Sequence, residues 1–167
     1  GCIFARESAM VEVAEPFDIV LTSNSGYPLD LNLYQAVKGM SAAAQVVRPG
    51  GAIIMAAECW DGIPEHGKYA QLLRDAASPE ALLEMIMSSP PGQDHWEAQI
   101  QAQVQLKADV YVYSHNLSEA QVREALLLPC GEIVERLEAL VGKYGAGARI
   151  CVLPEGPMTI AYTSYRP

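Results

Sequence analysis

Two polar side chains that could bind a carboxylate follow a short apolar segment near the start of the chain. Gln35 and Lys38 are three residues apart, so on a helix they would share one face. A lysine can hold a carboxylate by its charge, and an amide can orient it through directed hydrogen bonds. The spacing also fits a solvated surface lysine beside a neutral glutamine, which is the commoner situation for such a pair.

The loop before this pair has the composition of a ligand-binding connection between a strand and a helix. It runs from Ser23 to Asn32 and combines small polar residues with a glycine, which lets backbone amides face a ligand. Asp30 or Asn32 can cap the following helix. In open α/β sheets, ligands bind where the strands end, so this loop marks the expected binding edge.

Other catalytic and metal-binding motifs are absent from the sequence. It has no dinucleotide or phosphate-binding glycine motif, and no glycine-flanked serine nucleophile. The histidines His66, His95 and His115 have no spacing typical of metal ligands, so no metal-ligating residue is predicted. We expect all three in surface or loop positions.

Four short apolar runs predict the strands that would position the binding loop. They cover residues 18–22, 52–57, 109–114 and 149–153. Each is apolar through most of its length, as strands buried on both faces of a parallel sheet are. Segments of helical periodicity separate them. The sequence therefore predicts a three-layer α/β/α domain, Rossmann-like, with a mostly parallel sheet of four to five strands.

Helical spacing predicts the elements between these strands. The expected helices cover residues 30–47, 68–76, 79–87, 94–107, 119–126 and 131–144. Pro49, Gly50 and Gly51 are expected to end the first helix and turn into the second strand. Another strand at 158–162 is expected at an edge of the sheet.

Apolar positions and capping residues support several of these helices. Leu33, Val37, Met40 and Ala44 form an apolar stripe in the first helix. The last helix should bury Ile133, Val134, Leu137, Leu140 and Val141. Ser78 and Ser118 are expected to cap the helices that follow them.

Composition limits the partners and the location of the protein. With 167 residues, half of them apolar, the chain can bury one globular core. Its net charge of −9 repels phosphate backbones, so no nucleic-acid partner is expected. No apolar run approaches the roughly 20 residues that cross a bilayer, and no signal peptide is recognised, so we expect no membrane partner and a cytoplasmic location. The four cysteines lack metal-finger spacing and are expected to be reduced thiols.

One stretch of the sequence closely resembles the C-terminal domain of the lactate racemase family. It runs from Asp18 to Pro28 and continues with Asp30, Asn32 and residues 34–40. The resemblance continues through residues 49–55, 58–62, 96–99 and 152–154, and covers nearly the whole chain from about residue 16. It implies that 16–167 form this C-terminal domain. Residues 1–15 would then be a segment that leads from an N-terminal domain outside the chain, with a helical turn at 4–10.

The resemblance also implies an activity. Enzymes of this family move a hydride from a 2-hydroxy acid to a nickel-pincer cofactor, a pyridinium thiocarboxylate nucleotide, and return it to either face. The family's N-terminal domain tethers the cofactor and supplies the nickel ligand and the acid/base histidine pair. The resemblance therefore implies no catalytic residue and no covalently bound cofactor in this chain, which alone should be inactive.

The family's substrate-binding residues fall on Gln35 and Lys38, and Tyr34 flanks them in the cleft. Trp96 is similar to the aromatic residue that faces the cofactor pocket. The chain departs from the family at Ser25, where a glycine is frequent, and at Leu31, where a polar residue is frequent. With these two departures, the sequence is as compatible with a larger or more apolar 2-hydroxy acid, or with the epimerisation of such an acid, as it is with lactate. The rival hypothesis is a non-catalytic module that binds a small anion or a partner chain.

Overall fold

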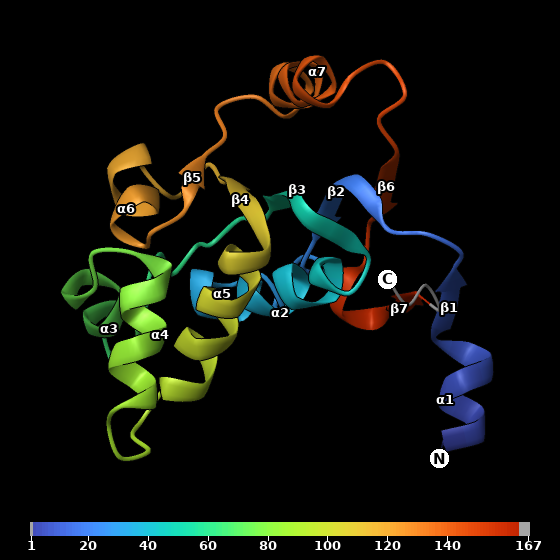
Figure 1. The fold of residues 1–167 in the computed structure, drawn as a ribbon. Coiled ribbons are helices and arrows are strands. Elements are labelled where there is room, and N and C mark those ends of the chain that lie inside the picture. The colour runs from blue at the N-terminus through green and yellow to red at the C-terminus, as the bar shows by residue number, and fades with distance from the viewer. Residues whose placement is uncertain (1, 164–167) are drawn as a thin grey trace.

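The computed structural model describes residues 2–163, and a five-stranded parallel sheet forms its centre (Figure 1). Neighbouring strands follow the order β5 (Leu128–Pro129), β4 (Ala108–Tyr113), β3 (Val47–Ala56), β2 (Phe17–Ser23) and β6 (Ile150–Leu153). Every pair in this sheet is parallel. Because helices cover both faces, the predicted three-layer α/β/α class is confirmed.

The central strands are apolar through most of their length because each face of the sheet carries its own core. In β3, Ile53 and Met55 pack into one hydrophobic cluster and Ile54 into the other. In β2, Val20 and Ile19 divide in the same way. Successive side chains of a strand point to opposite faces, so a strand covered on both sides needs an unbroken apolar run.

The larger core lies under the helices that connect β2 to β3 and β3 to β4. These are α2 (Leu33–Ala44), α3 (Tyr69–Asp75), α4 (Pro79–Met87) and α5 (His95–Lys107). The short α6 (Glu119–Glu124) adds Val122 to the same core. On the opposite face lies α7 (Ile133–Tyr144), which packs Leu140 against β2 and β3 residues. Figure 1 shows α2 and α5 on one side of the sheet and α7 on the other.

Local signals in the sequence predicted several helix ends correctly. The Ser78 side chain accepts a hydrogen bond from the backbone nitrogen of Ala81 at 3.2 Å. Ser118 and Gln121 form a capping box at the start of α6. All four residues of the predicted stripe in α2 are buried. These predictions held because a cap or an amphipathic stripe depends on neighbouring residues.

Two expectations about individual elements were wrong. Val134 does not join the buried face of α7, since it is 64% exposed. The segment Pro49–Gly51 does not separate α2 from β3, because α2 ends at Ala44 and β3 already begins at Val47. The register between β2 and β3 shifts between Phe17 and Ile19, so β3 continues through the proline and glycines.

The strand expected at 158–162 exists but does not extend the main sheet. It is β7 (Ile160–Thr163), and it pairs in parallel with β1 (Met10–Val13) in a separate two-stranded sheet. Before β1 lies α1 (Cys2–Ser8), so the helical turn expected at 4–10 is a helix that ends earlier. A short 3₁₀ helix, η1 (Gly156–Met158), joins β6 to β7. The domain boundary at residue 15 stays a prediction.

Across residues 2–163, the helices are all too short or too polar to cross a membrane.

Candidate functional site

A buried asparagine fixes the loop that follows β2. The side-chain oxygen of Asn24 accepts a hydrogen bond from the backbone nitrogen of Gly39 in α2 at 2.9 Å. Its side-chain nitrogen donates to the backbone oxygen of Leu29. A Cβ atom at Gly39 would lie 2.8 Å from the backbone oxygen of Ser23, so only glycine allows α2 to approach the strand end this closely. These contacts set the position of α2.

Two further polar residues organise the start of α2. The carboxylate of Asp30 accepts a hydrogen bond from the backbone nitrogen of Glu58 at 3.2 Å, and its backbone oxygen accepts one from Cys59 at 2.9 Å. The side-chain oxygen of Asn32 accepts a hydrogen bond from the backbone nitrogen of Gln35 at 3.1 Å. Of the two caps that the sequence allows, Asn32 therefore caps the helix, and Asp30 joins this loop to the one after β3.

The same loop turns through two residues in the left-handed backbone region. Ser25 has a φ of 67° and Gly26 a φ of 71°. A side chain raises the energy of this conformation, whereas glycine adopts it freely. The family often has a glycine where this chain has Ser25. The positive φ of Ser25 explains why glycine has a conformational advantage at this position. A cis peptide bond joins Tyr27 to Pro28.

Gln35 and Lys38 share one face of α2, as their spacing predicts. The ammonium of Lys38 donates a hydrogen bond to the side-chain oxygen of Gln35 at 2.5 Å. Lys38 is exposed, and Gln35 is half-buried. An ammonium has three donors, so a carboxylate can contact Lys38 while the bond to Gln35 remains. The Gln35 amide nitrogen can donate a second hydrogen bond to the same ligand.

Aromatic rings extend this site toward α5. The Tyr34 ring meets Tyr69 edge-on with centroids 5.2 Å apart, and meets Trp96 edge-on at 6.0 Å. Trp96 lies in the first turn of α5 and is 53% exposed, so its indole has free surface. Burial, and then the negative charges of Glu97 and Asp94, raises the pKa of Tyr34. The phenol therefore remains a hydrogen-bond donor at neutral pH.

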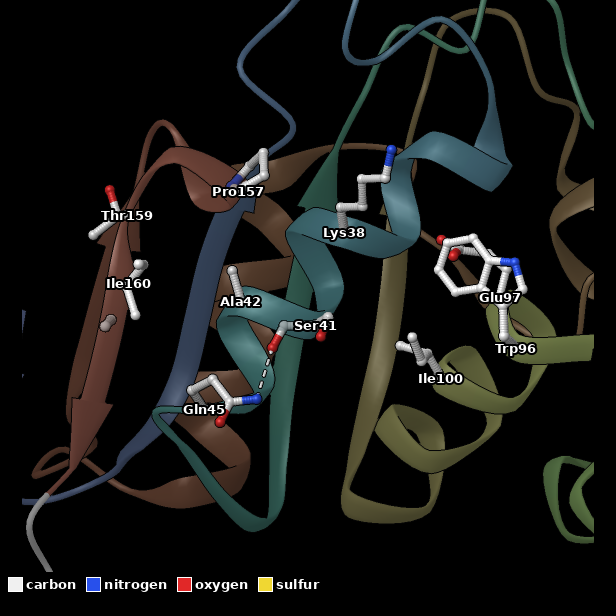
Figure 2. A pocket seen from close by; sticks show the side chains of 11 residues that line it. Lys38, Ser41, Ala42, Gln45, Trp96, Glu97, Ile100, Pro157, Thr159 and Ile160 are labelled. Atoms are coloured by element: carbon white, nitrogen blue, oxygen red, sulfur yellow. Dashed lines mark hydrogen bonds between the residues drawn. The ribbon is translucent and has the colours of Figure 1, made fainter. Parts of the chain in front are cut away.

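Two pockets divide the predicted residues between them. The larger, of about 350 Å³, includes Lys38 and Trp96 in its lining (Figure 2). Its other walls come from α2, α5 and residues 157–161. The smaller, of about 200 Å³, includes Tyr34 and Gln35. The Lys38 to Gln35 hydrogen bond and the Tyr34 to Trp96 ring contact each join a residue of one pocket to a residue of the other, so the four predicted residues form one neighbourhood.

A buried acid that the sequence analysis does not select also lines the larger pocket. Glu97 is 1% exposed, and neither of its carboxylate oxygens has a hydrogen-bond partner within the described residues. Burial raises the pKa of Glu97 to about 7, although the Lys38 charge opposes the rise, and Asp94 adds to it. Glutamine is the commonest residue of α5, and the helix has no clear apolar stripe, so the pattern did not reveal which positions are buried.

The three histidines lie on different segments of the chain, before α3, at the start of α5 and after β4. His66 is exposed in the lining of the smaller pocket. His115 is exposed beyond β4, where its Nε2 lies 2.9 Å from the Tyr113 hydroxyl and its Nδ1 lies 3.7 Å from a Glu58 carboxylate oxygen. His95 is half-buried at the start of α5. Within residues 2–163, no three His, Cys, Asp or Glu side chains gather closely enough to hold a metal ion.

The described thiols are free. Cys59 and Cys130 are buried, and Cys151 is half-buried. Burial, and then the charge of Asp30, raises the pKa of Cys59 to about 12, so this thiol stays protonated and unreactive. The side chain of Cys2 lies outside the described part of the chain.

The fold and the site together define a Rossmann-like α/β domain with a polar site beside the helix that follows β2. Residues 12–161 match the family described as lactate racemase C-terminal domain, and the chain belongs to this family. The family predicted from the sequence is therefore confirmed.

Two lactate racemases are similar over nearly all of the chain. That of Thermoanaerobacterium thermosaccharolyticum is 36% identical over 163 residues, which are 96% of this chain and 38% of that protein. That of Lactiplantibacillus plantarum is 33% identical over 159 residues, which are 93% of this chain and 37% of that protein. The chain thus spans less than two fifths of the length of these relatives.

Solved structures show the same fold. The lactate racemase apoprotein from T. thermosaccharolyticum matches with a TM-score of 0.87 and 35% identity, over 96% of this chain and 39% of that one. A protein from Thermotoga maritima matches with a TM-score of 0.59 at 11% identity, over 98% of this chain and 41% of that one, a likeness of fold alone.

Proposed function

We propose that this chain holds the substrate carboxylate in an enzyme that racemises or epimerises 2-hydroxy acids. The observation that carries the proposal is the Lys38 and Gln35 pair, hydrogen-bonded on the accessible face of α2 in a chain of the lactate racemase C-terminal domain family. Both named relatives are lactate racemases, which supports the reaction class.

Each side chain of the site has a distinct role in this proposal. The Lys38 ammonium attracts the substrate carboxylate, and the Gln35 amide fixes its orientation. Racemisation of a 2-hydroxy acid passes through a planar 2-keto acid, whose carboxylate has to stay in place while either face of the carbon is attacked. A carboxylate held at two points keeps the reacting carbon in one position. Tyr34, as a neutral phenol, flanks the same ligand.

The site fits a domain that faces a nickel-pincer cofactor without ligating its metal. The exposed indole of Trp96 offers a flat apolar surface of the kind that a planar pyridinium ring can contact. When bound, the cofactor would accept the hydride of the substrate carbon and return it. The proposal assigns the nickel ligand, the cofactor tether and the acid/base histidines to the N-terminal domain of the same polypeptide.

Two further features belong to the proposal. Closure of this domain on the N-terminal domain would exclude water from the keto acid, which reacts best in a dry site.

The enzyme would work in the cytoplasm, where free thiols such as Cys59 and Cys130 persist.

Chiral product analysis tests the function. The full-length, cofactor-loaded protein is offered a panel of single-enantiomer 2-hydroxy acids, and Lys38→Ala is assayed in parallel. Inversion of one acid, lost in the variant, supports the proposal and names the substrate. If verified cofactor loading gives no inversion of any acid, a non-catalytic module that binds a small anion or a partner chain becomes the better hypothesis.

A further inference from the structure

Glu97 is an acid in an environment that does not favour its charge. It is almost fully buried in the wall of the 350 Å³ pocket, and both of its carboxylate oxygens lack a hydrogen-bond partner within the described residues. A buried carboxylate without partners has a large desolvation cost, so it is driven either to bind a proton or to pair with a cation.

The charged and titratable groups that interact with Glu97 come from α2, from α3 and from the residue before α5. Lys38 and Tyr34 belong to α2, Tyr69 to α3, and Asp94 precedes α5. Lys38 is the cation of this group, whereas Asp94 is an acid and both tyrosines are neutral at physiological pH. Any change in the charge of Glu97 is therefore felt at Lys38.

Lys38 does not pair with Glu97 in the structure. Its ammonium bonds to the Gln35 side chain instead. Figure 2 shows that Lys38 extends from α2 and Glu97 from α5. The Glu97 oxygens lie beside the Trp96 indole, on the side toward α2. Lys38 therefore interacts with two groups, with the Gln35 side chain through a hydrogen bond and with the Glu97 carboxyl through its charge.

We infer that Glu97 is a positioning residue that controls, by gaining or losing a proton, how much of the Lys38 charge is available to the substrate carboxylate. Protonated Glu97 leaves the ammonium uncompensated beside Gln35, ready for an anion. Ionised Glu97 draws the ammonium toward itself and repels the incoming carboxylate. The inference rests on the proposed function, because it assumes that Lys38 binds the substrate.

The sign of the pH effect follows from this arrangement. Lys38 lowers the pKa of Glu97, whereas a carboxylate bound at Lys38 neutralises that cation and adds a negative charge. Substrate binding therefore raises the pKa of Glu97, and by linkage the substrate binds more tightly to the protonated form. With a pKa of about 7, KM should rise between pH 6 and pH 8, by up to about tenfold if the ionised form binds no substrate.

Steady-state kinetics of the full-length, cofactor-loaded enzyme test the inference. Wild type, Glu97→Gln and the control Glu135→Gln, an exposed glutamate of α7, are compared from pH 6 to pH 8 on the acid that the wild type inverts. Glu97→Gln should keep a KM near the wild-type value at pH 6 throughout, while the control follows the wild type. A Glu97→Gln variant that retains the wild-type rise in KM would overturn the inference.

A carboxyl carbon NMR titration supplies a readout that needs neither activity nor cofactor. The Glu97 signal, assigned through its bonded correlations to the Glu97 backbone, should titrate near pH 7 in the full-length protein and at higher pH in Lys38→Met. An unchanged midpoint in Lys38→Met would show that the two residues are not coupled, and would refute the inference even if Glu97→Gln failed to fold. Should the wild type invert no acid, the proposed function fails, and this titration alone decides the link between Glu97 and Lys38.

Discussion

The Lys38 ammonium and the Gln35 side-chain oxygen are joined by a 2.5 Å hydrogen bond across less than one turn of α2. This bond holds a flexible lysine over the face where the substrate carboxylate is proposed to bind. In the proposed site each residue would therefore act partly through the other, since Gln35 would both contact the ligand and orient the cation.

A double-mutant cycle measures this dependence. We expect Lys38→Ala to lower kcat/KM by about 30-fold to 1,000-fold, which corresponds to about 2 to 4 kcal/mol for a lost charge-assisted contact. Gln35→Ala should have a smaller effect, and the double variant should lose about 0.5 to 3 kcal/mol less than the sum of the two. The measurement is kcat/KM for all four proteins, and strict additivity would contradict a shared binding unit.

The chain contains a matched control for this cycle. Lys68 donates to the Gln71 side chain at 3.3 Å with the same three-residue spacing, at the start of α3. Because neither residue belongs to the proposed site, Lys68→Ala and Gln71→Ala should leave kcat/KM unchanged. Equal losses in both lysine variants would mean that general surface charge, and not the α2 site, attracts the substrate.

The buried Asn24 should matter for stability more than for ligand contact. Asn24→Ala removes the acceptor of the Gly39 backbone nitrogen and the donor to the Leu29 backbone oxygen inside the core. Leaving buried polar groups unpaired should lower the free energy of unfolding by about 1 to 3 kcal/mol. Urea denaturation measures the change. Asn116→Ala, which removes hydrogen bonds to Glu58 on the surface, should lower it by less than about 1 kcal/mol.

The sequence predicted those parts of the fold that local signals determine. The apolar runs of β2 and β3 and the caps at Ser78 and Ser118 were readable, because each depends on residues close in the chain. The pairing of β1 with β7 could not be predicted from the sequence, because it joins Met10 to Ile160 and both strands are only four residues long.

The site shows a similar division between local and tertiary information. The spacing of Gln35 and Lys38 predicted a shared helix face, and their selection as substrate ligands came from family resemblance. Glu97 could not be found from a pattern, because α5 lacks a clear apolar stripe and the burial of this acid depends on how α5 packs against α2 and α3. Its partnerless oxygens are a property of the tertiary structure alone.

Trp96 offers a test of the surface that faces the proposed cofactor. Since about half of the side chain is exposed, Trp96→Ala should change the free energy of unfolding by no more than about 1 kcal/mol, mostly through the lost contact with Tyr34. The same change should lower kcat/KM of the loaded enzyme by about tenfold or more, and Trp96→Phe should recover part of the loss. Trp60 is also exposed and lies outside both pockets, so Trp60→Ala should keep full activity. Normal activity in Trp96→Ala would remove this residue from the site.

Asp18 gives a prediction for stability against pH. Its carboxylate accepts a hydrogen bond from the backbone nitrogen of Arg149 at 2.8 Å and one from the Arg48 side chain at 2.6 Å. The first of these, and then the second, lowers the pKa of Asp18 in the folded protein. A lowered pKa means that the ionised acid stabilises the fold above the unfolded pKa of about 3.9, and that this contribution disappears as the pH falls through the folded value.

Asp18→Asn should therefore lower the free energy of unfolding at pH 7, and its deficit relative to wild type should shrink as the pH falls below about 4. Denaturant unfolding at a series of pH values measures the difference. Glu65→Gln is the control, because Glu65 pairs with Arg74 on the surface, where ion pairs contribute little. A deficit of Asp18→Asn that stays constant down to pH 2 would show that its effect comes from lost packing and not from the charge that links β2 to the segments around Arg48 and Arg149.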